Sequence, residues 1–159
     1  MSEDRLNLPF TGISTFAKVP HDPDLQNLQP DDIAIIGAPY DLSTQVRAGA
    51  RYGPRSIREA STIYGLRTVS YYDSEFDEVY LEGVRMIDVG DADMIHASPD
   101  RCLQNIQIML EAVLARKAFP VTLGGDHAVP IPILRAFGSA GYKNMCVVQI
   151  DAHLDFVDE

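Results

Sequence analysis

The sequence has no tryptophan, only two cysteines among 159 residues, and no hydrophobic run of the about 18 residues that a membrane-spanning helix needs. The cysteines form no CxxC or Cys-His spacing, so we expect Cys102 and Cys146 to be buried as small apolar side chains rather than to bind metal. The amino terminus has no basic region leading into an apolar one, as a secretory signal would. These absences predict a cytoplasmic protein without membrane contact.

Basic residues are also scarce, since 13 Lys and Arg stand against 23 Asp and Glu and leave a formal net charge of −10. Such a chain is repelled by phosphate backbones and anionic lipids, so we expect no nucleic-acid partner, whereas a small cationic ligand would be attracted. The G-x-S-x-G elbow, the phosphate-binding G-x-x-x-x-G-K-[ST] loop and a G-x-G-x-x-G turn after the first strand are absent as well. Serine-hydrolase and nucleotide-binding functions are therefore disfavoured.

Short apolar runs alternate with helix-like segments along most of the chain. The expected strands are residues 33–36, 85–89, 121–123 and 145–150. The expected helices are residues 55–60, a segment beginning at 98–99, and residues 128–137. The second helix carries one apolar stripe at helical spacing, formed by Cys102, Ile106, Met109, Leu110 and Val113. This alternation predicts a three-layer αβα sandwich around a parallel sheet.

Two regions fit this pattern less well. Residues 1–30 contain four prolines and little periodicity, so they are expected to form an irregular arm in front of an α/β domain at 31–159. Residues 67–80 are polar and aromatic, and no element is assigned to them.

Polar side chains follow two predicted strands at their carboxyl ends, where open parallel sheets bind ligands. Gly124-Gly125-Asp126-His127 follows one strand, and Asp151, His153 and Asp155 follow another. If the backbone stays extended, a spacing of two places the last three side chains on one face. Taken singly, His127 could be a helix-start histidine and Asp151 a cap. Together, these four side chains are candidate metal ligands, and a nitrogen and oxygen set without thiolate suits manganese better than structural zinc.

Other polar residues have weaker claims to function. We expect Asp88, Asp91 and Asp93 to form a solvated acidic turn after the second strand, and His21 and His96 to face solvent. Residues 41–54 form a long loop rich in Gly and Arg. Arg47 and Arg51 in that loop could contact a ligand or order the loop itself.

Three stretches of the sequence resemble the ureohydrolase family, the arginase and agmatinase group, and within it the agmatinase-like branch. They are Gly124-Gly125-Asp126-His127, Asp151-Ala152-His153-Leu154-Asp155 and the loop at 47–58, which is similar to the family's RxGxRxGPxxIR stretch. Residues 10–16 also resemble the family's amino-terminal arm. The resemblance implies the arginase/deacetylase-like fold, but it covers only the amino-terminal half of a typical member. The family's SxDxDxxDP motif is absent, so the chain is expected to be truncated.

The resemblance also implies a site and a reaction. His127 would bind one Mn²⁺ ion, His153 a second, Asp151 would bridge them, and Asp155 would join the ion of His127 and orient the hydroxide as the catalytic residue. A metal-bridging hydroxide would then cleave a linear guanidino compound such as agmatine to urea and an amine. Family members are usually trimers or hexamers, so the implied partners are a small cationic guanidino substrate and further copies of the chain.

Three alternatives remain open at this point. One is a guanidinobutyrase or related guanidino-acid hydrolase, whose anionic substrate tail would favour an arginine over carboxylates. Another is a noncatalytic fragment or assembly subunit that lacks the remaining metal ligands. The third is a metal-dependent deacetylase built on a related sheet.

Overall fold

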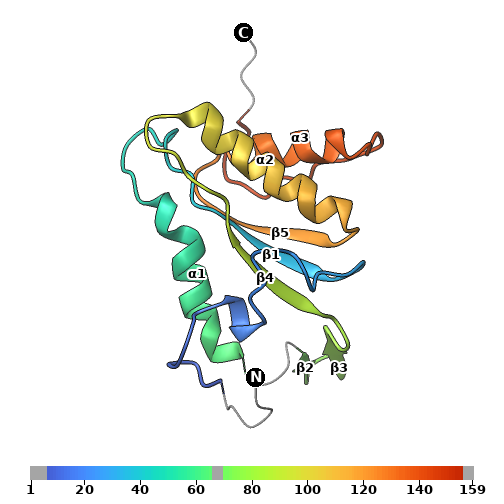
Figure 1. Cartoon of the computed structure of the whole chain (residues 1–159). Coiled ribbons are helices and arrows are strands. Elements are labelled where there is room, and N and C mark those ends of the chain that lie inside the picture. Colours follow the sequence, from blue (N-terminus) through green and yellow to red (C-terminus); the bar gives the residue numbers. More distant parts are fainter. Residues whose placement is uncertain (1–6, 66–69, 156–159) are drawn as a thin grey trace.

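A three-stranded parallel sheet organises the part of the chain that the computed structural model describes, residues 7–65 and 70–155 (Figure 1). β1 (Ile33–Ala38) is the central strand, flanked by β4 (Met86–Asp91) and β5 (Phe119–Gly124). Ile33 pairs with the first residue of both neighbours, so the three strands begin level and end at one edge. β1 is buried on both faces, which explains its continuous apolar run. These three strands confirm the predictions for residues 33–36, 85–89 and 121–123.

Helices cover both faces of the sheet and give the three-layer αβα arrangement that the sequence predicts (Figure 1). α1 (Gly53–Ser61) lies on one face, and α2 (Pro99–Ala115) and α3 (Pro130–Ser139) lie on the other. Each helix has a proline in its first turn, where the missing N–H costs no hydrogen bond. Short 3₁₀ turns occur at Phe16–Lys18, Ala50–Tyr52 and Thr62–Tyr64. No helix in the described residues is both long and apolar enough to cross a membrane.

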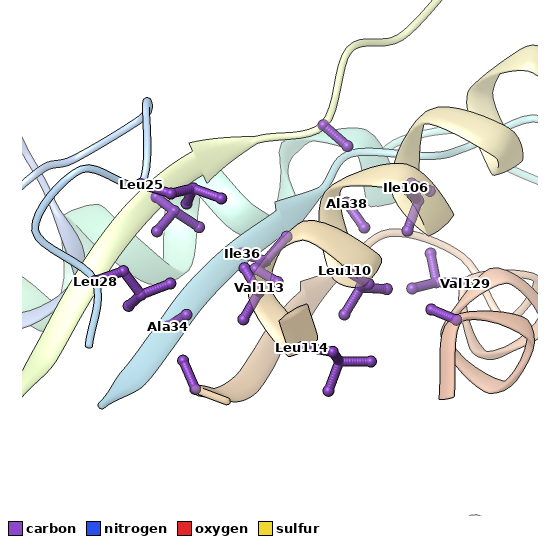
Figure 2. Close-up of a cluster of buried hydrophobic side chains, with 14 of the residues drawn as sticks. Leu25, Leu28, Ala34, Ile36, Ala38, Ile106, Leu110, Val113, Leu114 and Val129 are labelled. Carbon is purple, nitrogen blue, oxygen red and sulfur yellow. The ribbon is translucent and has the colours of Figure 1, made fainter. Parts of the chain in front are cut away.

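The main hydrophobic core lies between the sheet and α2 (Figure 2). Ile36 from β1 packs there with Ile106, Leu110 and Val113 of α2, and all four side chains are fully buried. Cys102 is also buried, whereas Met109 is partly buried at the margin, so the predicted apolar stripe is confirmed. Burying one such side chain contributes about 1.5–3 kcal/mol. Burial of this stripe therefore contributes much of the free energy that stabilises the packing of α2 on the sheet.

The opposite face of the sheet contains a buried ion pair. Ile87 and Val89 belong to the core on the α2 side, so the alternation of β4 directs Asp88 towards α1. The Asp88 carboxylate is 1% exposed and accepts hydrogen bonds from Arg58 Nε at 2.8 Å and Arg58 Nη2 at 2.9 Å. Arg58 also contacts the Asp91 carboxylate. The expectation of a solvated acidic turn is thus wrong for Asp88, because a guanidinium from α1 neutralises it in the interior.

The amino-terminal segment is fastened to β4 through the same aspartate. The backbone N–H of Asp88 donates to the carbonyl of Pro20, and the N–H of Asp22 donates to the carbonyl of Asp88, at 2.9 and 3.0 Å. The N–H of Phe16 donates to the Asp88 carboxylate at 2.8 Å. Asp88 therefore joins the segment, β4 and α1. The division into an arm at 1–30 and a domain at 31–159 stays a prediction.

Two stretches differ from the sequence-based expectation. Residues 145–150 are not a buried strand: they are exposed, pair with no described strand, and leave Ile150 98% exposed and Cys146 at the surface. An apolar β-branched run becomes a strand only where a neighbour pairs its backbone groups, and no described strand does so here. Tyr71–Asp73 (β2) and Glu78–Tyr80 (β3) form an antiparallel hairpin that the sequence analysis did not assign. Arg67, at the start of that stretch, lies outside the described residues.

Removing the buried carboxylate charge tests the role of the ion pair. Asp88→Asn should lower the free energy of unfolding by about 3 kcal/mol, because it leaves the Arg58 guanidinium buried with a weaker partner. Asp91→Asn is the matched control, and it should cost less than about 1 kcal/mol because the Asp91 side chain is 44% exposed. Urea unfolding at pH 7 measures both values. Equal losses in the two variants would contradict this assignment.

Candidate metal centre

The turn after β5 is pressed against the end of β1. An added Cβ at Gly125 would lie 2.0 Å from the carbonyl oxygen of Tyr40 and 2.7 Å from its nitrogen, so only glycine fits. The N–H of Asp126 donates to the same carbonyl at 2.8 Å. This close approach places His127 beyond the carboxyl ends of β1 and β5, just before α3. The position agrees with the sequence-based expectation that ligands collect at that edge.

The side chain of Asp126 joins the turn to the loop that follows β1. Its Oδ2 accepts a hydrogen bond from the backbone N–H of Ser43 at 2.7 Å. Its Oδ1 accepts one from the N–H of Ala128 at 2.9 Å, which forms a local Asx turn. In the sequence, Asp126 stands out only as part of the motif Gly124-Gly125-Asp126-His127. An aspartate just before a helix start is a signal that could have indicated such a turn, but no sequence pattern indicates its long-range partner Ser43.

Three of the four candidate ligands come together at this edge. Nδ1 of His127 lies 2.8 Å from Oδ2 of Asp155 and 4.0 Å from Oδ2 of Asp151. One donor atom from each of these residues lies within 4.8 Å of the others. The side chains are partly open to solvent, with 55% of His127 exposed. An imidazole nitrogen and two carboxylate oxygens at this spacing fit a single divalent cation.

His153 lies at the other oxygen of Asp151. Its Nδ1 is 3.2 Å from Oδ1 of Asp151, and its backbone N–H donates to the same oxygen at 2.8 Å. The backbone bends here instead of staying extended, and Asp155 adopts a left-handed conformation with φ of 48°. The pKa of Asp151 is lowered, mainly by the hydrogen bond from the His153 backbone; burial opposes this shift, and smaller contributions from the two imidazoles add to the lowering. His153 thus stands outside the three-residue cluster but shares Asp151 with it.

A buried carboxylate organises the loop at 41–53. The side chain of Asp41 is 1% exposed and accepts hydrogen bonds from Arg51 Nε at 3.0 Å and from the N–H of Gly49 at 2.6 Å. Arg51 therefore orders the loop, which was one of the two roles considered for it. Arg47 is exposed, and no hydrogen bond or ion pair joins its side chain to another described residue. Asp41 was not predicted as important, although it follows β1 at the same sheet edge as the candidate ligands.

The far end of the loop contacts the turn formed by Gly124 and Gly125, here called the glycine turn. An added Cβ at Gly53 would lie 2.5 Å from the carbonyl oxygen of Gly124. Ser43, near the start of the loop, is bound to Asp126 of the same turn. Both ends of the loop therefore rest on the segment that carries His127. The Gly-Pro pair at 53–54 also starts α1 at this contact.

Comparison with known proteins gives the family to which this chain belongs. The model of the arginase family matches residues 31–159, and the chain belongs to that family. The chain is 32% identical over 149 residues to a guanidinobutyrase from Pseudomonas aeruginosa, covering 94% of this chain and 45% of that protein. It is 35% identical over 133 residues to an agmatinase from Halalkalibacterium halodurans, covering 84% of this chain and 44% of that protein. The chain thus spans less than half the length of these relatives.

Solved structures show the same fold. Proclavaminate amidino hydrolase from Streptomyces clavuligerus superposes with a TM-score of 0.69 at 30% identity, over 82% of this chain and 41% of that one. A formiminoglutamase from Trypanosoma cruzi, solved with Mn²⁺, superposes with a TM-score of 0.57 at 31% identity, over 70% of this chain and 36% of that one. The predicted arginase-like αβα fold with a parallel sheet is therefore confirmed.

Replacing each glycine of the turn by alanine should have very different effects on the free energy of unfolding. Gly125→Ala should lower the free energy of unfolding by about 3 kcal/mol, because the new Cβ would overlap the backbone of Tyr40. Gly124→Ala is the matched control, since nothing lies within 4 Å of its added Cβ, and it should change stability by less than about 0.5 kcal/mol. Thermal and urea unfolding measure both. A destabilised Gly124→Ala with a tolerated Gly125→Ala would refute the contact.

The pKa of Asp41 tests the order of the loop. Its hydrogen bond with Arg51 lowers this pKa to about 2, with the N–H groups of Gly49 and Arg51 also contributing against the effect of burial. A lowered pKa stabilises the folded state above the ordinary pKa of about 4, and this stabilisation is lost as the pH falls towards about 2. In Arg51→Ala the pKa of Asp41 should rise towards its ordinary value, whereas Arg47→Ala should leave it unchanged. Carbon-13 NMR titration of the Asp41 carboxyl distinguishes these outcomes.

Proposed function

We propose that these residues belong to the active site of a manganese-dependent amidinohydrolase, which cleaves a linear guanidino compound to urea and an amine. The observation that carries this proposal is the arrangement around Asp151. Its Oδ2 faces His127, its Oδ1 faces His153, and Asp155 lies against His127. A carboxylate between two imidazoles is suited to bridge two cations.

The donor set fits Mn²⁺. His127, Asp155 and one oxygen of Asp151 would hold one ion, and His153 and the other oxygen of Asp151 would contribute to a second. The set consists of imidazole nitrogens and carboxylate oxygens without thiolate, and the related formiminoglutamase was solved with Mn²⁺. When bound, such ions act as Lewis acids and activate a water molecule as a nucleophile at neutral pH.

The chain's own residues would position the reactants. Asp155 has a side chain that is 46% exposed, with one oxygen against His127, so its carboxylate can accept a hydrogen bond from the nucleophile and orient it towards the planar guanidinium carbon. We assign Asp155 as the catalytic residue on this basis. His127 and His153 hold their ring nitrogens at separate oxygens of Asp151, which would keep the two metal positions apart.

For the substrate we propose a small cationic guanidino compound of the agmatine type. The net charge of −10 attracts such a molecule, and an agmatinase is among the relatives. A guanidino acid is the second candidate, because the exposed Arg47 offers a free guanidinium to a carboxylate tail and a guanidinobutyrase is also a relative. We further propose a cytoplasmic homo-oligomer, a trimer or hexamer, whose contacts would cover exposed apolar side chains such as Phe10, Ile13 and Tyr64.

Manganese binding and urea release test the proposal. His127→Ala and Asp151→Ala should each weaken Mn²⁺ binding by more than tenfold, because each removes a ligand from the cluster. His96→Ala is the matched control, since His96 is exposed outside the cluster, and its affinity should stay unchanged. Electron paramagnetic resonance of free Mn²⁺ measures the affinity in this chain.

Turnover by the natural protein with Mn²⁺ identifies the reaction. Urea release from agmatine is expected, and a preference for guanidinobutyrate would favour the guanidino-acid alternative. Mn²⁺ binding without any urea release would favour the noncatalytic subunit. Turnover of acetylated amines without urea release would instead identify a deacetylase.

A further inference from the structure

Asp126 lies between the loop at 41–53 and the candidate ligand His127, and each of its oxygens has a separate partner. Oδ2 accepts the N–H of Ser43, and Oδ1 accepts the N–H of Ala128. Its own N–H donates to the carbonyl of Tyr40, and its carbonyl accepts the N–H of Val129 at 3.2 Å. Asp126 thereby connects the loop after β1, the end of β1 and the first residues before α3.

His127 depends on this connection for its position. Its side chain is 55% exposed, and its polar contacts within the described residues are with the carboxylates of Asp151 and Asp155. Side-chain packing therefore contributes little to its placement. The backbone on either side is held instead, at Asp126 by Tyr40 and at Ala128 by the Asp126 carboxylate. A ligand whose supporting contacts are lost typically binds its metal 10- to 100-fold more weakly.

The loop depends on the same residue. Asp41 orders the middle of the loop through Gly49 and Arg51, but neither contact reaches the glycine turn. The bond between Ser43 and Asp126 is the described hydrogen bond that ties the loop's first residues to the turn. Asparagine could not replace Asp126, because it has one acceptor oxygen and its amide group would meet an N–H donor at the other position.

We propose that Asp126 is a positioning residue that couples the order of the loop at 41–53 to the placement of His127. This inference rests on the proposed role of His127 as a metal ligand. Because coupling between two sites is reciprocal, a metal ion at His127 should stabilise the loop. Loss of the hydrogen bonds of Asp126 should therefore weaken both the metal binding and the order of the loop.

Two variants of this chain separate Asp126 from the loop itself. Asp126→Asn should weaken Mn²⁺ binding about tenfold and increase the rate of trypsin cleavage after the exposed Arg47. Asp41→Asn is the matched control: it should increase cleavage to a similar extent but weaken Mn²⁺ binding less than Asp126→Asn does, because the described hydrogen bonds of the Asp41 side chain go to Thr44, Gly49 and Arg51 and the bond between Ser43 and Asp126 stays in place. A third variant, His127→Ala, gives the affinity that remains without the ligand. Circular dichroism verifies that each variant is folded.

The wild-type chain provides a measurement that needs no variant. Addition of Mn²⁺ should slow cleavage after Arg47, and the protection should be absent in Asp126→Asn. Lack of protection in the wild type would overturn the coupling, as would an unchanged affinity in Asp126→Asn when His127→Ala binds weakly. The proposed function would survive either result. Unchanged affinity in His127→Ala would instead show that the metal site itself is wrongly assigned.

Discussion

The contact between Gly125 and the backbone of Tyr40 determines where His127 and the start of the loop at 41–53 lie in the candidate site. Because no side chain separates the two segments, the turn after β5 rests directly on the end of β1. The N–H of Asp126 then reaches the carbonyl of Tyr40, and the Asp126 carboxylate reaches Ser43. The parallel register of β1 and β5 brings both strand ends to this level. One close approach of two backbones therefore places His127 and the start of the long loop together.

The two faces of the sheet are stabilised by different interactions. On the α2 side, apolar side chains at helical spacing are buried against β1. On the α1 side, Arg58 and Asp88 form a buried ion pair whose net value depends on complete pairing, because desolvation of both charges opposes their attraction. Burial alone would lower the pKa of Arg58, but its hydrogen bonds with Asp88 and Asp91 raise it overall. The Asp88 carboxylate also accepts a hydrogen bond from the N–H of Phe16. The ion pair therefore specifies how the amino-terminal segment, β4 and α1 meet.

Local patterns in the sequence predicted the elements whose formation depends on local spacing. The stripe from Cys102 to Val113 and the apolar run of β1 are examples. The clustering of His127 with Asp151 and Asp155 was expected from two neighbouring strand ends, but only the strand before His127 forms. Interactions between distant residues were not predictable in this way. The partner of Asp88 lies 30 residues away in α1, and the exposed state of residues 145–150 depends on whether a neighbouring strand is present. The periodicity of the sequence indicates neither the partner of Asp88 nor the exposure of residues 145–150.

The candidate ligands consequently rest on supports of unequal rigidity. His127 follows a turn held by β1, by Asp126 and by the first residues of the loop. Asp151, His153 and Asp155 follow an exposed segment that pairs with no described strand, and their mutual contacts are local, such as the bond from the His153 N–H to Asp151. Ordering such a segment costs conformational entropy, which opposes metal binding wherever the ion itself must order its ligands. If the cluster binds a metal ion as proposed, its affinity depends on what holds residues 145–155 in place as well as on the turn that carries His127, which the fold already orders.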